Sequence, residues 1–386
     1  MLDPSAPIYP VADQLWSTHD LLAKFIDPAH QLNGLSRFSD LHLKVGQPVT
    51  YRYDGDLAPV PDAAPLTPAL CEQLVFPLLT PKQIEFLKAE PPTDIDASWE
   101  WLEHKINFRF NVFHDREGLS AVLRVLPPSI PDVDQIGFPN DRIWQEICAL
   151  SQGLVLVTGQ TGTGKSTTIA AMLKQINRTR RVRIITLEDP IEYIFTSNRA
   201  LFSQREVNRH VTSFAAGLRS ALREDPDIIY VGEMRDSETA ALALTAAETG
   251  HLVFSTLHTR DTRSAITRII DMFPSERTKE VTTQLSLSLH SVLGGKLLSR
   301  VSGGRIMAME VLKNTLPMAN LIRTGAIHQI QSLLETGMKE GMNTLDHHIQ
   351  TLLQEGEITH EEALLAATDP KAFPPLAQRP RPRVVA

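Results

Sequence analysis

The order of apolar and polar positions divides the chain into two patterns, and the first covers residues 36–126. Within it, short stretches alternate between apolar and polar residues and stop at turns, which is typical of half-buried strands. These predicted strands cover residues 41–45, 49–53, 106–113 and 120–125. Residues 67–79 and 81–89 are predicted helices. We therefore expect a small α+β domain at 36–126, preceded by an N-terminal extension at 1–35.

The second pattern begins after a linker at residues 127–139, where several prolines remove backbone donors and interrupt regular structure. A helix is predicted at 141–151. Apolar runs separated by helical segments then follow at residues 153–158, 182–187, 228–232, 252–255 and 306–312. Such runs are typical of a mostly parallel sheet that is buried on both faces. We expect an α/β domain at 140–312, a helical part at 313–369 and a disordered tail, rich in proline and arginine, at 370–386.

Composition narrows the class of protein. The 386 residues carry a net charge of −7 and are 42% hydrophobic, which fits a globular protein of two or three domains. The acidic balance disfavours a chain that coats nucleic acid. Two cysteines, Cys71 and Cys148, exclude a disulfide scaffold and a four-cysteine zinc site. No secretory signal or bilayer-spanning run is visible, so we expect a soluble intracellular protein without membrane insertion.

A phosphate-binding loop follows the first strand of the α/β domain. Its residues are Gly159, Gln160, Thr161, Gly162, Thr163, Gly164, Lys165 and Ser166, with Thr167 next in the chain. The glycines let backbone N–H groups point inward at phosphate oxygens, and the lysine adds a charge to the β- and γ-phosphates. The Ser166 hydroxyl is placed to bind Mg²⁺. We expect ATP and Mg²⁺ as ligands; the alternative is a glycine-rich turn without a ligand.

Acidic residues and a histidine follow neighbouring strands at their carboxyl ends. Glu188, then Asp189 and Glu192, follow the strand at 182–187, and Glu233 follows the strand at 228–232. His258 lies just beyond the strand at 252–255. In a doubly wound sheet these ends share one edge, where hydrolysis needs metal-binding and water-activating groups. The alternatives are carboxylates that cap helices and a structural histidine.

Four arginines are further candidates. Arg109 and Arg124 are on predicted strands of the first domain, and Arg219 and Arg223 are on the helix before the Glu233 strand. Phosphoryl-transfer sites use cations to hold charge in the transition state, and such a cation can come from a neighbouring subunit. Their spacing alone does not distinguish these four from solvated surface arginines.

Taken together, the motifs resemble those of the bacterial secretion ATPases, and within them the PilT/PilU-type retraction ATPases of type IV pili. Residues 186–193 resemble the family's Asp box, residues 220–236 its Walker B region and residues 249–259 its His box. Residues 319–323 resemble the C-terminal signature of the retraction branch. The similarity extends from about residue 36 to residue 370.

The resemblance implies a RecA-like P-loop ATPase core with a PAS-like N-terminal domain and C-terminal helices. It implies a homo-hexameric ring in the cytoplasm that hydrolyses ATP to power pilus retraction and twitching motility, attached to the inner membrane through a pilus platform protein. Glu188 would be the general base, although the sequence leaves open whether Glu233 takes that role. Glu233 would hold Mg²⁺ and position water, and His258 would sense the γ-phosphate. Arg109 and Arg124 would reach nucleotide, and Arg219 and Arg223 are candidate intersubunit arginines.

The sequence departs from the family pattern at several positions. Asn107 stands where an extra arginine is common, Asn208 and His210 replace a typical Gly and Asp, and Gly294 and Gly295 replace a Ser-Gln pair. Two other functions therefore stay open. One is the ATPase of a related type IV secretion or conjugation system, and the other is a nucleotide-gated binding module with little turnover.

Overall fold

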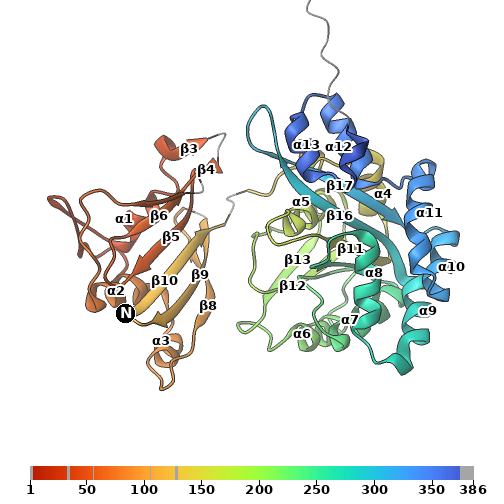
Figure 1. Cartoon of the computed structure of the whole chain (residues 1–386). Helices are drawn as coiled ribbons and strands as arrows, with labels where there is room; N and C mark the ends of the chain where they lie inside the picture. The colour runs from red at the N-terminus through yellow and green to blue at the C-terminus, as the bar shows by residue number, and fades with distance from the viewer. Residues whose placement is uncertain (1–2, 33–34, 55, 105, 127–128, 374–386) are drawn as a thin grey trace, which may run out of the picture. The chain divides into compact units, whose positions relative to one another are not determined.

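The computed structural model describes residues 3–32, 35–54, 56–104, 106–126 and 129–373. The chain divides into two compact units, Met1–Ser129 and Ile130–Ala386 (Figure 1). In the part of the chain that the structure describes, no helix combines the length and the apolar character that crossing a bilayer requires.

The first unit is built on a six-stranded antiparallel sheet in the order β7-β6-β5-β10-β9-β8. Its strands are β5 (Phe38–Lys44), β6 (Thr50–Tyr53), β7 (Asp56–Pro59), β8 (Ile95–Trp101), β9 (Ile106–Asp115) and β10 (Gly118–Val125). The predicted alternation is clear on β9, where Ile106, Phe108, Phe110 and Val112 are buried. These side chains form one core with α2 (Pro68–Val75), and α3 (Pro81–Leu87) lies beside β8.

The segment before residue 36, predicted to be an extension, belongs to the same core. It forms β1 (Tyr9–Val11), β2 (Gln14–Trp16), α1 (Thr18–Ala23), β3 (Gln31–Leu32) and β4 (Leu35–Ser36). Tyr9, Leu21 and Phe25 are buried in the core of the first unit. The Tyr51 hydroxyl also donates to the Leu21 carbonyl at 2.7 Å. The apolar residues of this segment follow no extended helix or strand period. The sequence therefore did not predict that the segment packs into the core.

The second unit contains a seven-stranded sheet in the order β13-β12-β14-β15-β11-β16-β17. Its strands are β11 (Gly153–Thr158), β12 (Arg183–Glu188), β13 (Leu201–Glu206), β14 (Ile228–Val231), β15 (Leu252–Leu257), β16 (Leu289–Ser299) and β17 (Arg305–Lys313). All neighbours are parallel except β16 and β17, which form a long antiparallel pair. The predicted parallel α/β fold is therefore present, and the carboxyl ends of β11, β12, β14 and β15 meet at one edge.

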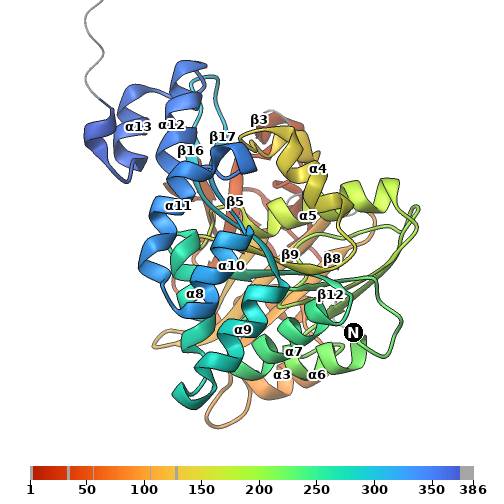
Figure 2. The ribbon, with the colours of Figure 1, turned by 90° about the vertical axis from the view of Figure 1, so that its right-hand side faces the viewer.

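Helices cover both faces of this sheet (Figures 1 and 2). Val155 and Val157 of β11 pack with α4 (Asp141–Ala149) and α5 (Lys165–Thr179). Leu154 and Leu156 point to the opposite face and pack in the other layer. That layer contains α6 (Phe214–Ala221), α7 (Ser237–Glu248), α8 (Thr262–Asp271), α9 (Thr278–Ser288), α10 (Leu316–Thr324) and α11 (Ile330–Thr336).

The predicted C-terminal helices continue from this layer onto the β16–β17 pair. The last two, α12 (Leu345–Gln354) and α13 (His360–Ala366), form a small core of their own with Leu298 and Ile306 of the pair. Phe373 is buried in the same core, although it lies within the tail predicted to be disordered. The remainder of that tail, 374–386, lies outside the described residues.

In the second unit, two strands and one boundary differ from the prediction. β13 is a polar edge strand, and β16 contains Gly294 and Gly295, so neither shows the apolar run of a central strand. A Cβ on Gly295 would lie 2.7 Å from the Met307 side chain, which explains why a glycine fits there. Residues 127–128 of the predicted linker lie outside the described part. The end of the linker belongs to the second unit, where Val133 and Ile136 are buried.

Candidate functional site

The phosphate-binding loop connects β11 to α5, as the sequence predicted. Gly159, Gly162 and Gly164 have φ values of 151°, 81° and 87°, a region that side chains with a Cβ rarely adopt. At Gly159 the space is also closed, because a Cβ would lie 2.5 Å from the Thr163 hydroxyl and 3.0 Å from the Gly295 carbonyl. The loop is thus held in a curled conformation that delivers the chain to the N-terminus of α5, where orphan N–H groups favour an anion.

Lys165 turns back over the loop that precedes it. Its side chain is 8% exposed, and its Nζ donates to the carbonyls of Gly159 at 2.9 Å and Gln160 at 3.0 Å. Burial lowers the pKa of Lys165, while Glu192 and Glu233 oppose that shift. The ammonium group is therefore kept at the mouth of the loop, where nucleotide phosphates would bind.

Glu188 ends β12 and is 5% exposed. Its Oε1 accepts hydrogen bonds from the Thr186 hydroxyl at 2.6 Å and from the Gln204 amide at 3.1 Å. Burial raises the pKa of Glu188 to about 7, because removal from water penalises the charged form more than these two donors stabilise it. A carboxyl group that exchanges its proton near neutral pH suits a general base.

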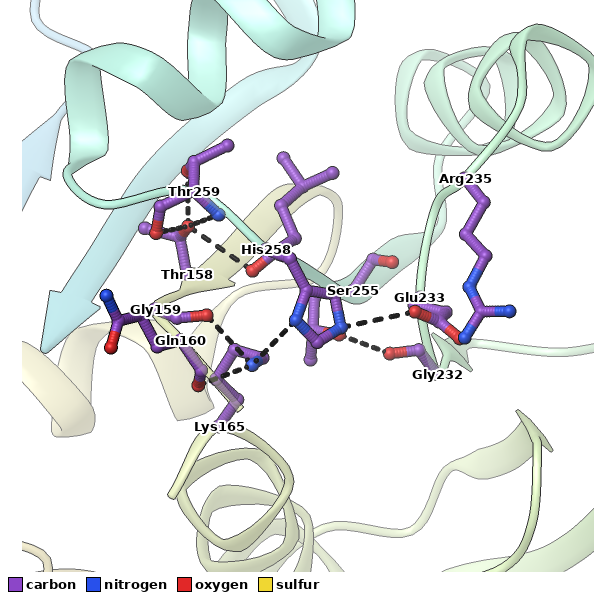
Figure 3. Close-up of polar contacts among 12 residues, drawn as sticks. Thr158, Gly159, Gln160, Lys165, Gly232, Glu233, Arg235, Ser255, His258 and Thr259 are labelled. Atoms are coloured by element: carbon purple, nitrogen blue, oxygen red, sulfur yellow. Dashed lines mark hydrogen bonds and ion pairs between the residues drawn. The ribbon is translucent and has the colours of Figure 1, made fainter. Parts of the chain in front are cut away.

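Glu233 and His258 come together from the ends of two neighbouring strands (Figure 3). The Glu233 side chain is 11% exposed, forms an ion pair with Arg235 and lies 3.3 Å from the Nε2 atom of His258. The Nδ1 atom of the same ring lies 3.5 Å from the Nζ atom of Lys165. Because an ammonium group can only donate, Nδ1 is the acceptor in the contact with Lys165. His258 therefore bridges the loop lysine and the strand-end carboxylate.

Hydroxyl groups at the edge of the sheet support this arrangement. The Thr158 hydroxyl lies 2.5 Å from the Thr259 hydroxyl and accepts from the Thr259 N–H at 3.2 Å. These bonds tie the end of β11 to the segment that carries His258. On the other side of Glu233, the Thr256 hydroxyl donates to the Gly232 carbonyl at 2.5 Å.

Buried tyrosines contact the residues that follow Lys165. The Tyr193 hydroxyl lies 2.8 Å from the Thr167 hydroxyl, and Tyr230 hydrogen bonds to Ser166. Ser166 and Glu233 are the predicted Mg²⁺ ligands, and hydroxyl and carboxylate oxygens are ligands that Mg²⁺ accepts beside water and substrate phosphates. The chemistry of this donor pair therefore fits the ion.

The candidate arginines are distributed over both units. In the first, Arg124 donates to the buried Asp40 at 2.7 Å and is paired in the ladder with the exposed Arg109. In the second, Arg219 forms an exposed ion pair with Glu238 on α7, and Arg223 is exposed. The contribution of these four arginines to the site stays a prediction.

Several residues at the site were not candidates from the sequence. Gln204 on β13 and Tyr230 on β14 lie on either side of Thr186, with which each is paired in register. Neither is in the P-loop or among the acidic residues. A signal was available, because β13 is polar where it borders the Glu188 strand. Asn208, which replaces a typical glycine, has a φ of 63°, and asparagine tolerates this conformation better than most residues.

Comparisons with known proteins show the family to which the chain belongs. The model of the Type II/IV secretion system protein family matches residues 18–303. The chain is 43% identical to the type IV pilus retraction ATPase PilT of Pseudomonas aeruginosa, over 87% of this chain and 96% of that protein. It is 46% identical to a twitching motility protein of Neisseria gonorrhoeae, over 70% of this chain and 72% of that protein.

A crystal structure of the pilus retraction motor PilT with bound ADP has the same fold, with a TM-score of 0.81 and 41% identity over 91% of this chain and 97% of that chain. The chain belongs to the type II/IV secretion system protein family, within its PilT/PilU-type retraction ATPases. The resemblance and the fold class inferred from the motifs are thereby confirmed.

Proposed function

We propose that this protein is a hexameric, Mg²⁺-dependent ATPase motor that powers type IV pilus retraction. The observation that carries the proposal is the contact of His258 with both Lys165 and Glu233 at the phosphate-binding loop (Figure 3). The buried Glu188 ends β12, the strand beside β14, at the same carboxyl edge of the sheet. The names of the relatives, a pilus retraction ATPase and a twitching motility protein, point to the same activity.

In this proposal, the loop N–H groups and Lys165 bind the β- and γ-phosphates of ATP, and Glu188 takes a proton from the attacking water. The bond between the water oxygen and the γ-phosphorus forms while the bond to the bridging oxygen breaks, leaving ADP and phosphate. Ser166 and Glu233 would hold Mg²⁺, which neutralises phosphate charge when bound.

The structure favours different roles for the two glutamates. Glu188 has a pKa near neutrality and no cation among its hydrogen-bond partners, so it can accept and release a proton. Glu233 is held in place by its contacts with Arg235 and His258. We therefore assign proton transfer to Glu188, and metal binding and water positioning to Glu233. His258, bonded to both Glu233 and Lys165, would report the arrival of the γ-phosphate to both strands.

In a ring, a neighbouring subunit would supply arginines to the nucleotide site. Arg109, Arg124, Arg219 and Arg223 would act on the nucleotide of the same or a neighbouring subunit, which makes turnover depend on assembly. A pilus platform protein would hold the ring at the cytoplasmic face of the inner membrane.

The test is the ATPase activity of the purified full chain, measured with and without Mg²⁺ alongside particle size. We expect Mg²⁺-dependent turnover by a hexamer and a loss of turnover in Lys165→Ala. Turnover in the wild type no greater than in this variant would contradict an enzyme and support the nucleotide-gated binding module. Deleting the gene and scoring surface motility separates retraction from a secretion machine, since the latter leaves motility intact.

A further inference from the structure

The Gln204 side chain lies between Glu188 and the segment that follows β12. Its Nε2 donates to Glu188 Oε1 at 3.1 Å and to the Tyr193 carbonyl at 2.8 Å. Its Oε1 accepts the backbone N–H of Phe195 at 2.8 Å. Both amide donors and one acceptor position are therefore used.

The direction of the Gln204 amide is determined by the backbone. The Phe195 N–H can only donate, so the amide atom that faces it must be the oxygen. The NH₂ group is then obliged to point at Glu188 and at the Tyr193 carbonyl, which can only accept. If the amide were flipped, its oxygen would face the Glu188 carboxylate and the Tyr193 carbonyl, which are both acceptors. Burial makes such a mismatch costly.

The sheet places a second donor on the same oxygen of Glu188. Thr186 is paired in register with Gln204 and lies two residues before Glu188, so the three side chains share one face of the sheet. The Thr186 hydroxyl donates to Oε1 at 2.6 Å, whereas Oε2 receives the backbone N–H of Glu192 at the longer distance of 3.4 Å. One carboxylate oxygen is anchored twice and the other is held loosely.

We propose that Gln204 is a positioning residue for Glu188: with Thr186 it anchors Oε1 and so leaves Oε2 as the atom that takes the proton from the attacking water. This inference rests on the proposed function, in which Glu188 is the base. Two fixed donors on one oxygen restrict rotation of the carboxylate, and a fixed orientation is what proton transfer in a water-excluded site requires.

The charged and titratable groups around Glu188 agree with this role. Glu192, from the segment after β12, raises the pKa of Glu188, and Tyr230 on β14 lies within electrostatic reach of it. Glu206, on β13, is its partner in register. Burial and Glu192 raise the pKa of Glu188, whereas the hydrogen bonds from the Thr186 and Gln204 side chains lower it. Loss of the Gln204 donor should therefore raise it.

Gln204 also connects the 193–195 segment to β13, so a purely structural role must be separated from positioning. A matched control exists in Ser197, whose hydroxyl accepts the Phe202 N–H at 2.9 Å. Ser197→Ala removes a bond between the same segment and β13 without touching Glu188.

The experiment measures kcat and KM for ATP against pH in the full chain carrying Gln204→Met, Gln204→Glu or Ser197→Ala. We expect Gln204→Met to lower kcat at pH 7 roughly tenfold and to move the acid limb of kcat up by about one pH unit, with KM changed less than about threefold. Gln204→Glu, of the same shape, should move the limb further, because it places a second carboxyl group beside Glu188. Ser197→Ala should leave the limb where it is.

A second readout does not depend on turnover. Infrared difference spectra of the protein without nucleotide, recorded while pH is raised, follow the protonated carboxyl band that Glu188→Gln removes. In Gln204→Met this band should persist to higher pH than in the wild type. This band also tests the positioning role if Gln204→Met assembles poorly.

The possible failures are distinct. If Glu188→Gln keeps wild-type turnover, the assignment of the base is wrong and the proposed function loses its mechanism. If Glu188→Gln is inactive but both Gln204 variants keep the wild-type pH profile and carboxyl band, the base stands and the positioning role is overturned. A loss of kcat in Ser197→Ala as large as in Gln204→Met, with no shift of the limb in either, would show that Gln204 serves the fold alone.

Discussion

The Nε2 atom of His258 lies 3.3 Å from the Oε2 atom of Glu233, although the two residues come from different strand ends. The other ring nitrogen of His258 faces Lys165. A ring that bonds to both a phosphate-binding lysine and a strand-end carboxylate connects nucleotide binding with the group that we assign to Mg²⁺.

Glu233→Gln should bind ATP but lose turnover. The substitution keeps the shape of the side chain and removes its charge, which leaves Arg235 without an ionised partner. We expect ATP affinity within about threefold of the wild type and a fall in kcat of roughly 10²-fold or more. Fluorescent-nucleotide titration and steady-state kinetics measure the two quantities. Glu280→Gln, which removes an exposed partner of Arg277, is the control, and equal kinetics in both variants would refute the assignment.

The stability of the protein should fall with rising pH through the titration of Glu188. Its pKa is raised from 4.5 to about 7 in the folded state, so between these values the folded state binds more protons than the unfolded state. Stability is then greatest below about pH 4.5 for this group and is lost as pH rises towards 7, by roughly 3 kcal/mol in total.

Glu188→Gln should remove this dependence, because the amide does not ionise. Denaturant melts at pH 5 and pH 8 should show a smaller difference for the variant than for the wild type, and the variant should be the more stable protein at pH 8. Parallel pH dependences of the two proteins would mean that Glu188 does not titrate near neutrality.

Gly159→Ala should weaken nucleotide binding. Its φ of 151° and the close Thr163 and Gly295 atoms leave no room for a Cβ, so the loop must open to accept the methyl group. We expect a loss of about 1–3 kcal/mol in stability and at least a tenfold loss of ATP affinity. Gly303→Ala is the matched control, since Gly303 has a positive φ but no atom within 4 Å of the new Cβ. It carries the backbone strain without the collision and should bind ATP normally.

Asp40→Asn should weaken the first unit and impair turnover. The Asp40 carboxylate is 3% exposed and pairs with Arg124 at 2.7 Å and with Arg52 at 3.9 Å. Removing its charge should cost about 1–3 kcal/mol and release Arg124, which we propose acts on nucleotide. Asp56→Asn, at an exposed position on the edge strand β7, is the control. Wild-type melting and wild-type kcat in Asp40→Asn would exclude both effects.

Some features of the site could be predicted because they are local. The curl of residues 159–164 and the start of α5 at Lys165 depend on glycines and on a helix N-terminus, both of which are properties of consecutive residues. The placement of Glu188, Glu233 and His258 at one edge followed from a general rule for parallel strands.

Other features could not be predicted because they depend on neighbours in the sheet. The contact between Gln204 and Glu188 exists because β13 lies beside β12 in a particular register. The residues of β13 are too polar for the sequence to predict a strand there. Likewise β16, which contains Gly294 and Gly295, is an interior strand because it pairs with β11 on one side and with β17 on the other.

By itself, the sequence determined the class of protein, the phosphate-binding loop and the acidic and histidine residues that serve it, since these are written as short motifs with fixed spacing. Only the tertiary structure decided the burial of Glu188, the contacts of Thr186 and Gln204 with its Oε1 atom, and the position of His258 between Lys165 and Glu233. The physical reason is that burial and hydrogen-bond partners set the protonation of a group, and both are supplied by strands that are distant in the chain.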